Sequence, residues 1–511
     1  MPGKSIVKDL IAYIIILTGV SGILTAGKAT GAQLRAGVAK VDITNTGSYD
    51  VINDSLYVKA LALEYGTIKA VIITVDAVAI GGIGSIGDNY LEEVRSQIQN
   101  ELNVSKKNIL VNASHLHGAG YNVCPDIAER TVKAVKMAWQ NRVAVNTGVG
   151  RGYENRITEN RRFILKNGKE ADIRHAYPMP PDEEVVAIGP VDTEIGILRL
   201  DKKNGETLAV IYNFAGHPYQ GVPNKGATAD FPGFASKIIE DNLNEGAIAL
   251  FIQGFGGDIS TVLYKDFNNP RDAETLGDML GISAMSAIRN IETVKEGELK
   301  VINEVIKLPR RTDFQEKIDP MQAEVDRLLK SLRGTSLNFK TFFPLYIKYN
   351  LFEKYPSYYS HRYLHEKMTG NESLKNLDAA NRQNMDKYLK NLYAMDKLAR
   401  LQANISLLKM HQKMNEEADE STVDVEVQGM RIGDFILVTF PGEVSAQVGL
   451  NIKKMSPHKY TFPAGFTNGY IYYAPTVEQY DGGVQEDCDC FIAPEWQTIY
   501  EKKVSEILNN L

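Results

Sequence analysis

Three of the eight histidines in the sequence follow short apolar runs, and their placement predicts a metal site. His115 and His117 come after the run at 109–111, and His217 comes after the run at 210–214. In an extended segment, residues two apart point to the same side, so we expect His115 and His117 to face one site together. Imidazole and carboxylate side chains are common zinc ligands. Each histidine alone is more often a structural side chain, and only their joint placement favours a metal site.

Five segments share one layout, in which an apolar run leads through small or turn residues to a reactive side chain. The five side chains and their segments are His117 (109–117), His217 (210–217), Ser260 (250–260), Glu443 (435–443) and Tyr473 (465–473). Strand ends that feed short loops are where enzymes built on sheets assemble their sites. We therefore expect these five segments to converge on one crevice.

The glycine-rich segment 254–260 has two interpretations. Its glycines at 254, 256 and 257 allow a close approach of the backbone to a ligand, and Ser260 is then a nucleophile or a proton donor. The alternative is a plain glycine turn capped by Asp258 and Ser260. The segment is not a dinucleotide fingerprint, because position 259 holds isoleucine instead of a third glycine.

Strand-like and helix-like segments that could position these residues alternate along the chain. We predict strands at 70–75, 108–111, 208–212, 248–252, 299–306, 423–427, 435–440 and 460–473. We predict helices at 90–101, 126–139, 232–243, 272–291 and 494–508. This pattern is typical of a mixed α/β protein with central mixed β-sheets flanked by helices.

The segment from about 312 to 420 is polar and interrupts this pattern with helical periodicity. Two apolar stripes at helical spacing flank a stretch with ten aromatic residues between 339 and 363. The stripes are Met321, Val325, Leu328, Leu329 and Leu332, then Leu398, Leu401, Ile405 and Leu408. One interpretation is an antiparallel helical insertion with its own small core. The other is a lid whose aromatic side chains face an apolar substrate.

The N-terminus predicts export of the protein. Lys4 and Lys8 precede 18 uncharged residues (10–27), and small residues follow. This pattern indicates a secretory signal over residues 1–31, with an uncleaved membrane anchor or a buried helix as alternatives. We expect a secreted or periplasmic protein, either free or tethered by one N-terminal helix.

The composition excludes several classes of protein. With 57 Lys and Arg against 63 Asp and Glu, the net charge of −6 gives no reason to expect nucleic-acid binding. Three cysteines cannot form a disulfide scaffold.

Several ordered motifs resemble the neutral (non-lysosomal) ceramidases, a family of zinc amidases that split the N-acyl bond of ceramide. The resemblance covers about 34–309 and again 423 to the end. It lies in Ser-His-Leu-His-Gly at 114–118, Asn-Arg-Arg at 160–162, Ala-Gly-His-Pro at 215–218, Gly-Asp-Ile-Ser at 257–260, Pro-Gly-Glu at 441–443 and Asn-Gly-Tyr-Ile-Tyr-Tyr at 468–473.

The resemblance implies a role for each of these residues. It implies zinc ligands at His115, His217, Glu443 and Tyr473. His117 would steady the oxyanion and Arg161 would contact the substrate. Ser260 would be the catalytic serine, which either attacks the carbonyl or positions the zinc-activated water. The family's second oxyanion residue, a tyrosine, falls on Gln485, and Tyr480 is its nearest substitute.

Departures from the family pattern leave the metal site in place but leave the substrate open. Thr261 and Val262 follow the serine where the family has Pro-Asn, and 38 residues after Tyr473 leave no room for the family's C-terminal immunoglobulin-like domain. We expect hydrolysis of ceramide or a related N-acyl lipid, with association at a membrane surface. The alternatives are a zinc esterase or deacetylase on a smaller or sugar-derived substrate, and a catalytically silent exported binding protein.

The three cysteines follow two of these motifs in the sequence. Cys124 follows the first histidine motif, and Cys488 and Cys490 follow the tyrosine motif. If both loops border the site, Cys124 could pair with Cys488 or Cys490 in an oxidising compartment. Metal binding by Cys488 and Cys490, or three free thiols, are the alternatives.

Overall fold

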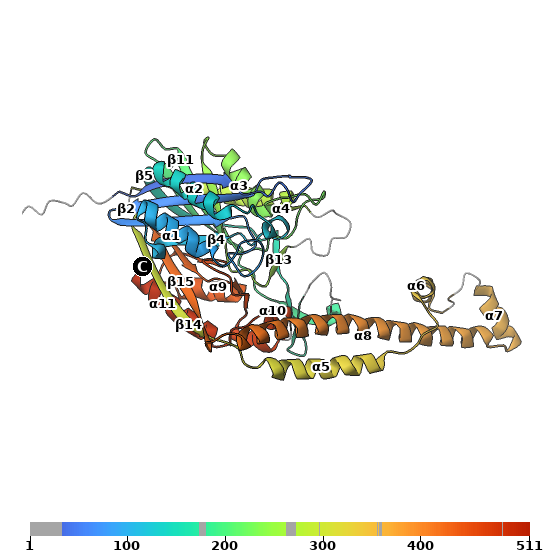
Figure 1. Ribbon diagram of the computed structural model, residues 1–511. Coiled ribbons are helices and arrows are strands. Elements are labelled where there is room, and N and C mark those ends of the chain that lie inside the picture. The colour runs from blue at the N-terminus through green and yellow to red at the C-terminus, as the bar shows by residue number, and fades with distance from the viewer. Residues whose placement is uncertain are drawn as a thin grey trace, which may run out of the picture.

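A computed structural model describes residues 33–172, 180–261, 272–295, 297–354, 356, 360–482 and 484–511. The expected signal segment at 1–31 lies outside the described residues. None of the helices in the described ranges is long and apolar enough to cross a membrane. The protein consists of a layered α/β body and a long helical arm that projects from it (Figure 1).

The larger sheet of the body has eight strands in the order β12-β11-β10-β5-β1-β2-β3-β4. The pairs β3–β4 and β11–β12 are parallel and the other neighbours are antiparallel, so the sheet is mixed. Its strands are β1 (Arg35–Asp42), β2 (Tyr57–Tyr65), β3 (Ile68–Val75), β4 (Ile109–Ala113), β5 (Val143–Tyr153), β10 (Glu194–Lys202), β11 (Thr207–Phe214) and β12 (Ile248–Gln253).

Four helices cover one face of this sheet. The helices α1 (Tyr90–Leu102) and α2 (Ile127–Gln140) pack on the half that contains β1 to β4. The helices α3 (Asp230–Asp241) and α4 (Ala273–Ile288) pack on the half that contains β10 to β12. The two-residue period of a strand separates the faces, because Ile73 faces the helices while Ile72 faces the second sheet.

The second sheet has the order β14-β15-β16-β18 and lies against the other face of the first. Its strands are β14 (Leu299–Pro309), β15 (Thr422–Ile432), β16 (Phe435–Thr439) and β18 (Tyr460–Ala464). Leu437 and Phe462 pack between the two sheets, whereas Val438 packs with the outer helices α9 (Ala446–Met455) and α11 (Trp496–Asn510). The resulting helix–sheet–sheet–helix body confirms the predicted mixed α/β class.

Short elements complete the body and line the edge where the strands end. Two pairs of short strands are β6 (Thr158–Asn160) with β13 (Ile259–Thr261), and β17 (Glu443–Val444) with β19 (Tyr473–Ala474). A three-stranded sheet contains β7 (Arg162–Leu165), β8 (Glu170–Asp172) and β9 (Val185–Ile188). A short helix, α10 (Gln485–Cys488), lies near the C-terminus.

The continuous strand predicted at 460–473 was wrong. The strand β18 stops at Ala464, and β19 begins only at Tyr473. Phe466, Asn468 and Tyr472 between them have left-handed backbone conformations (φ 49°, 60° and 60°), which a strand does not contain. The segment therefore forms a loop that folds over the strand ends.

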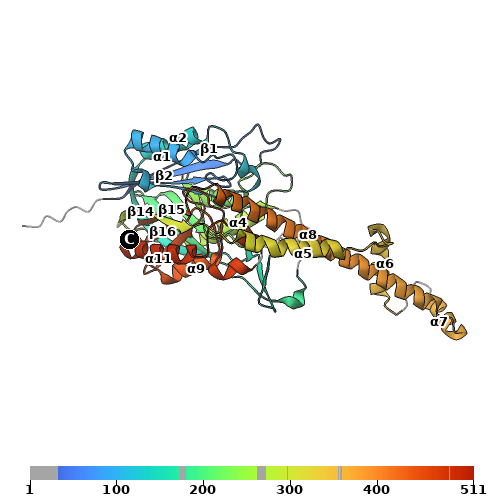
Figure 2. The same ribbon diagram turned by 60° about the horizontal axis from the view of Figure 1, so that its bottom comes forward.

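The segment between β14 and β15 is helical, as predicted, and forms the arm. It contains α5 (Phe314–Ser331), α6 (Phe339–Leu351), α7 (Ser360–Thr369) and α8 (Ser373–Glu416). The helix α5 lies along α8, and the distal half of α8 extends away from the body with α6 and α7 (Figure 1; Figure 2). Phe342 and Tyr349 of α6 pack on Met385 of α8, so the arm has a small core of its own.

Candidate active site

Hydrogen bonds join the five predicted segments at one edge of the body. The Asn112 side chain at the end of β4 donates to the Gly465 carbonyl (2.7 Å) and accepts from the Gln253 N–H (3.0 Å). The Gln253 side-chain amide donates to the Gly216 carbonyl (2.6 Å), and the Glu443 N–H donates to the Tyr472 carbonyl (2.9 Å). These bonds confirm the predicted convergence, because each of the five segments takes part in at least one of them.

His115 reaches the site through an unusual backbone conformation. Its φ of 60° is left-handed, which is uncommon outside glycine and costs conformational energy. The ring stacks on Phe466 with centroids 4.0 Å apart, and Nδ1 lies 2.8 Å from the Val78 carbonyl oxygen. His115 and His117 do share one site, but the chain turns here, so strand alternation is not the reason.

The three histidines form one cluster. The Nε2 atom of His115 lies 3.0 Å from Nε2 of His217 and 3.2 Å from Nε2 of His117. His115 and His217 are buried and His117 is half-buried. Burial, followed by the neighbouring charges, lowers the pKa of both His115 and His217 well below the usual histidine range. Both imidazoles are therefore neutral, which is the form that binds metals.

The residues present fit a metal ion. Nδ1 of His115 faces the Val78 carbonyl and Nδ1 of His217 faces the Gly256 carbonyl (3.4 Å), so each Nδ1 carries the proton and each Nε2 presents a lone pair. Two opposed lone pairs repel unless a cation lies between them. Glu443 adds a buried oxygen, Oε2, that has no hydrogen-bond partner and lies 3.5 Å from Nε2 of His115 and 3.9 Å from Nε2 of His217.

Glu443 lies between two tyrosines. Its strand β17 pairs in parallel with β19, which places Glu443 opposite Tyr473. The Tyr470 hydroxyl donates to Oε1 of Glu443 (2.5 Å). Burial raises the pKa of Glu443 to about 7, although the tyrosine hydrogen bonds and the Arg161 charge oppose that rise. A cation beside Oε2 would lower the pKa of Glu443, as the Arg161 charge does, and so favour the ionised carboxylate.

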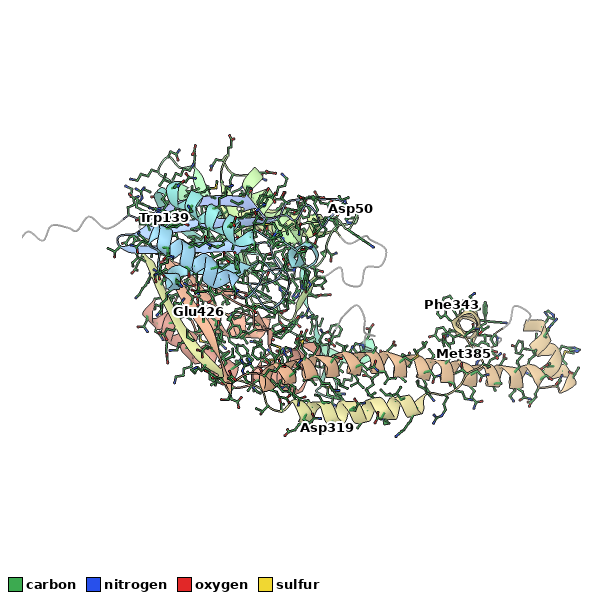
Figure 3. The ribbon with its side chains drawn as sticks, viewed as in Figure 1. Asp50, Trp139, Asp319, Phe343, Met385 and Glu426 are labelled. Carbon is green, nitrogen blue, oxygen red and sulfur yellow. The ribbon has the colours of Figure 1, made fainter. Side chains whose placement is uncertain are left out.

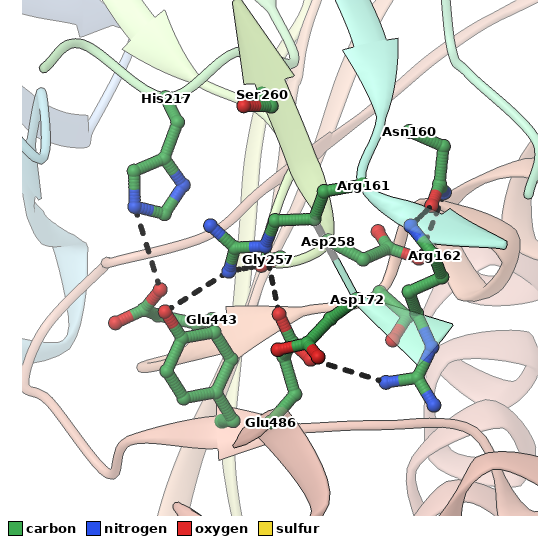
Figure 4. A network of polar contacts seen from close by, with 12 residues as sticks. Asn160, Arg161, Arg162, Asp172, His217, Gly257, Asp258, Ser260, Glu443 and Glu486 are labelled. Carbon is green, nitrogen blue, oxygen red and sulfur yellow. Dashed lines mark hydrogen bonds and ion pairs between the residues drawn. The ribbon is translucent and has the colours of Figure 1, made fainter. Parts of the chain in front are cut away.

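Arg161 connects Tyr473, the glycine-rich segment and Glu486 through its guanidinium group (Figure 4). Its guanidinium donates to Glu486 (2.7 Å), to the Tyr473 hydroxyl (3.1 Å) and to the Gly257 carbonyl. Arg161 is 5% exposed, so its charge is directed into the protein. This arrangement suits a residue that positions Tyr473 and the glycine loop, whereas the sequence resemblance implied a substrate contact.

The glycine-rich segment approaches the Glu443 strand at a distance that only glycine permits. A Cβ atom on Gly257 would lie 2.5 Å from the Glu443 carbonyl oxygen. The nearest atoms it would meet all belong to the backbone of Glu443 and Val444, so no side chain could move aside to make room. The next residue, Asp258, accepts from the Ala446 N–H (2.8 Å) and from the Asn160 side chain (3.0 Å). The segment is therefore held between β17, the start of α9 and β6.

Ser260 lies on β13 and is buried, with its neighbour across the short ladder on β6 being Glu159. Its hydroxyl is hydrogen-bonded to the Tyr219 hydroxyl. The Tyr219 ring makes edge contacts with the rings of His217 and His117, with centroids 5.6 and 6.1 Å apart. Tyr219 therefore links Ser260 to the histidine cluster.

A cavity of about 570 Å³ opens beside the cluster. His117 and Tyr219 form its inner wall, and Tyr49, Val222 and Pro223 contribute apolar surface. Polar side chains that line the same space are Gln220, Lys225, Thr228 and Asp230. This volume lies within the range of small-molecule sites.

The structure places Tyr480 outside this cluster. Its hydroxyl donates to the Ile492 carbonyl (2.9 Å), and its ring packs in the hydrophobic core that includes Trp496 and Tyr500.

Cys124 does not form a disulfide with Cys488 or Cys490. Cys124, Cys488 and Cys490 are all free and buried. Cys124 belongs to the core beneath α2, whereas Cys488 and Cys490 belong to the core beneath α11.

Three residues of the site were not singled out from the sequence. Tyr219 follows His217 by two residues, and this spacing was the available signal. Tyr470 belongs to the tyrosine motif at 468–473, in which the resemblance implied a role for Tyr473 alone. Glu486 carried no signal, because only the packing of α10 against the Arg161 segment brings its carboxylate to Arg161.

Comparison of whole structures gives this chain the fold of neutral ceramidase. The crystal structure of neutral ceramidase from Pseudomonas aeruginosa matches with a TM-score of 0.59 and 16% identity, over 93% of this chain and 74% of that chain. A structure of a ceramidase complexed with C2 matches with a TM-score of 0.60 and 16% identity, over 93% and 75% of the two chains. No family model and no curated protein sequence matches this chain.

Proposed function

We propose that this protein is a metal-dependent hydrolase that cleaves the N-acyl amide of ceramide or a related lipid. One observation carries the proposal: two lone-pair nitrogens and a buried carboxylate oxygen face one another beside a cavity. The neutral ceramidase fold of the chain supports the same reaction class. Its expected signal segment is consistent with a secreted or periplasmic enzyme.

His115, His217 and Glu443 would hold the ion. His117 lies beside His115, and Tyr473 lies opposite Glu443, so these two side chains are the candidates for a further ligand. Imidazole and carboxylate donors suit Zn²⁺. When bound, Zn²⁺ supplies Lewis-acid polarisation of the substrate carbonyl.

The protein's own residues would do the rest of the chemistry. His117 lines the cavity and would donate to the oxygen on which negative charge develops. Ser260, hydrogen-bonded to Tyr219, would attack the acyl carbon or orient the attacking water. In the overall reaction the C–N bond breaks, the acyl carbon gains a hydroxyl group from water, and the amine gains a proton.

The side chains that line the cavity indicate which substrates it could accept. Its apolar wall at Tyr49, Val222 and Pro223 would accept an acyl chain, whereas Gln220 and Asp230 would bind polar groups of the base. A smaller N-acyl compound or an ester is the second candidate, because the cavity is lined by both kinds of side chain and all the lining residues named above belong to the body.

The test is hydrolysis of a fluorescent short-chain ceramide by the purified chain, with and without a zinc chelator. The variants are Ser260→Ala and His217→Ala, and the matched control is His458→Ala, which removes a histidine that binds the Leu508 carbonyl. We expect fatty acid release that the chelator abolishes, that both variants lose and that the control retains.

Two other outcomes are informative. A chain that carries stoichiometric zinc but releases no fatty acid would overturn the lipid substrate, and smaller N-acyl compounds and esters would then be screened. A chain that binds no metal and hydrolyses none of these compounds would overturn the hydrolase.

A further inference from the structure

The helix α6 near the end of the arm carries an apolar stripe on its outer side. Phe339, Phe343, Ile347 and Leu351 recur every four residues, which places them on one face of a helix. They are 64%, 49%, 40% and 70% exposed. Single exposed apolar residues are ordinary, but a contiguous stripe of this kind marks an interaction surface.

The inner side of the same helix is already occupied. Phe342 stacks on Tyr388 of α8, with ring centroids 4.5 Å apart, and the Tyr349 hydroxyl donates to Asp378 (2.6 Å). These contacts fix the orientation of α6 on α8. The outer stripe must therefore face away from the arm, where Figure 3 shows Phe343 far from the body.

The segment that carries the stripe has a net positive charge. Between residues 338 and 371 there are five Lys and Arg residues against two Glu residues, in a chain whose net charge is −6. Lys340 and Lys348 lie on α6 itself. An amphipathic helix with aromatic residues on one side and lysines beside them is typical of segments that lie in the interface of an anionic bilayer.

We infer that the tip of the arm docks on an anionic lipid bilayer. The helix α6 lies in the plane of the interface, with Phe339, Phe343, Ile347 and Leu351 among the upper acyl chains and Lys340 and Lys348 at the phosphates. This binding does not depend on the proposed catalysis. It assigns the aromatic helix α6 to the membrane, in place of the substrate lid considered from the sequence.

The direction of the arm fits this role. Asp50, next to the cavity-lining Tyr49, lies on the side of the body toward which the arm extends (Figure 3). The helix α8 is 44 residues long, so its tip reaches well beyond the body. The tip can therefore meet a bilayer that lies in front of the cavity side.

The experiment uses the full chain with the reporter variant Phe343→Trp. The two native tryptophans, Trp139 and Trp496, lie in the body, so the added signal reports on the tip. We expect a blue shift and quenching by brominated lipid with vesicles of phosphatidylcholine and phosphatidylglycerol (3:1). A matched reporter, Ile282→Trp, sits on an exposed position of α4 (61% exposed) and should show neither change.

Two further variants separate the apolar and the charged contributions. Phe339→Ser/Ile347→Ser/Leu351→Ser in the reporter background should lower vesicle binding at least about tenfold. Lys340→Gln/Lys348→Gln should lower it about fivefold or more on anionic vesicles and leave neutral vesicles unaffected. None of the five substituted positions is buried in α6, and circular dichroism checks that the helices are retained.

Three results would overturn the inference. The first is a reporter at position 343 that stays in water at every lipid composition. The second is equal binding by the serine variant and the parent. The third is a dimer, seen by light scattering, that the serine substitutions dissociate while vesicles show no binding, because the stripe would then contact a second copy of the chain.

Discussion

The Nε2 atoms of His115 and His217 lie 3.0 Å apart, although each imidazole presents its Nδ1 atom to a backbone carbonyl. A carbonyl can only accept a hydrogen bond, so both Nδ1 atoms carry protons and neither Nε2 can donate to the other. The approach is stable only if a cation is shared between them. The backbone of two loops thus determines which tautomer each histidine adopts.

Metal content gives the first prediction. His217→Ala and Glu443→Gln should each weaken metal binding by at least about tenfold, because each removes a ligand atom and losses of even indirect supporting groups have effects of this size. The measurement is metal analysis by mass spectrometry after dialysis against buffers of fixed free zinc. His458→Ala should bind as much zinc as the parent, and equal zinc in all four proteins would contradict the site.

The Tyr219–Ser260 hydrogen bond gives the second prediction. Tyr219→Phe should lower kcat by up to about tenfold with little change in KM, because one neutral hydrogen bond contributes about 1 kcal/mol. The measurement is steady-state kinetics of Tyr219→Phe, Ser260→Ala and the double variant. If Tyr219 acts through Ser260, the double variant is no slower than Ser260→Ala. Additive losses would show that the two hydroxyls act separately.

The third prediction concerns Gly257. Gly257→Ala should destabilise the protein by about 1–3 kcal/mol, because the new Cβ meets the backbone of Glu443 at 2.5 Å and backbone cannot rotate away. It should also reduce zinc binding, since Glu443 must move. Gly87→Ala is the control, as a Cβ there meets nothing within 4 Å. The measurement is urea unfolding of both variants, together with zinc titration.

Arg161 gives the fourth prediction. Arg161→Met should destabilise the protein by about 1–3 kcal/mol, because it removes a charge-assisted hydrogen bond from the buried Glu486 carboxylate, which keeps its ion pair with Arg162 (3.4 Å). Arg161→Lys should rescue only part of this loss, since a lysine cannot donate in the same fork to Glu486, Tyr473 and Gly257. Urea unfolding measures both, and full rescue by lysine would show that charge alone suffices.

The fifth prediction is a dependence of stability on pH. Burial raises the pKa of Asp230 to about 7, against the opposing hydrogen bonds from the Gly221 and Phe231 N–H groups. In the unfolded chain this carboxyl titrates near pH ~3.9. Between these values the folded protein holds a proton that the unfolded chain releases. The free energy of unfolding therefore falls as pH rises, by up to about 1.4 kcal/mol per pH unit, and levels off above the folded pKa.

The control for this dependence is Asp230→Asn. The variant cannot titrate at this position, so its stability should decline less steeply than that of the parent between about pH 5 and 7. Urea unfolding across that range measures both curves. Parallel curves for the two proteins would show that Asp230 does not contribute.

Much of the local structure could be predicted from the sequence because it depends on near neighbours. The apolar runs at 70–75 and 248–252 became β3 and β12, and the periodic stretches at 90–101 and 126–139 became α1 and α2. The sequence could also place the three histidines and Glu443 at the ends of strands, although their roles in the site stay a prediction. The failure at 460–473 has a local cause too, since strand propensity does not register the left-handed residues Phe466 and Asn468.

The sequence by itself determined which side chains stand at the strand ends and that an aromatic, helical segment separates β14 from β15. The tertiary structure alone decided that His115 turns through a left-handed conformation to meet His217, that Glu486 reaches Arg161 from 325 positions away, and that the apolar stripe of α6 stays exposed. The physical reason is range. Strand and helix patterns reflect interactions between residues a few positions apart, whereas the site and the direction of the arm depend on packing between segments that are hundreds of residues apart.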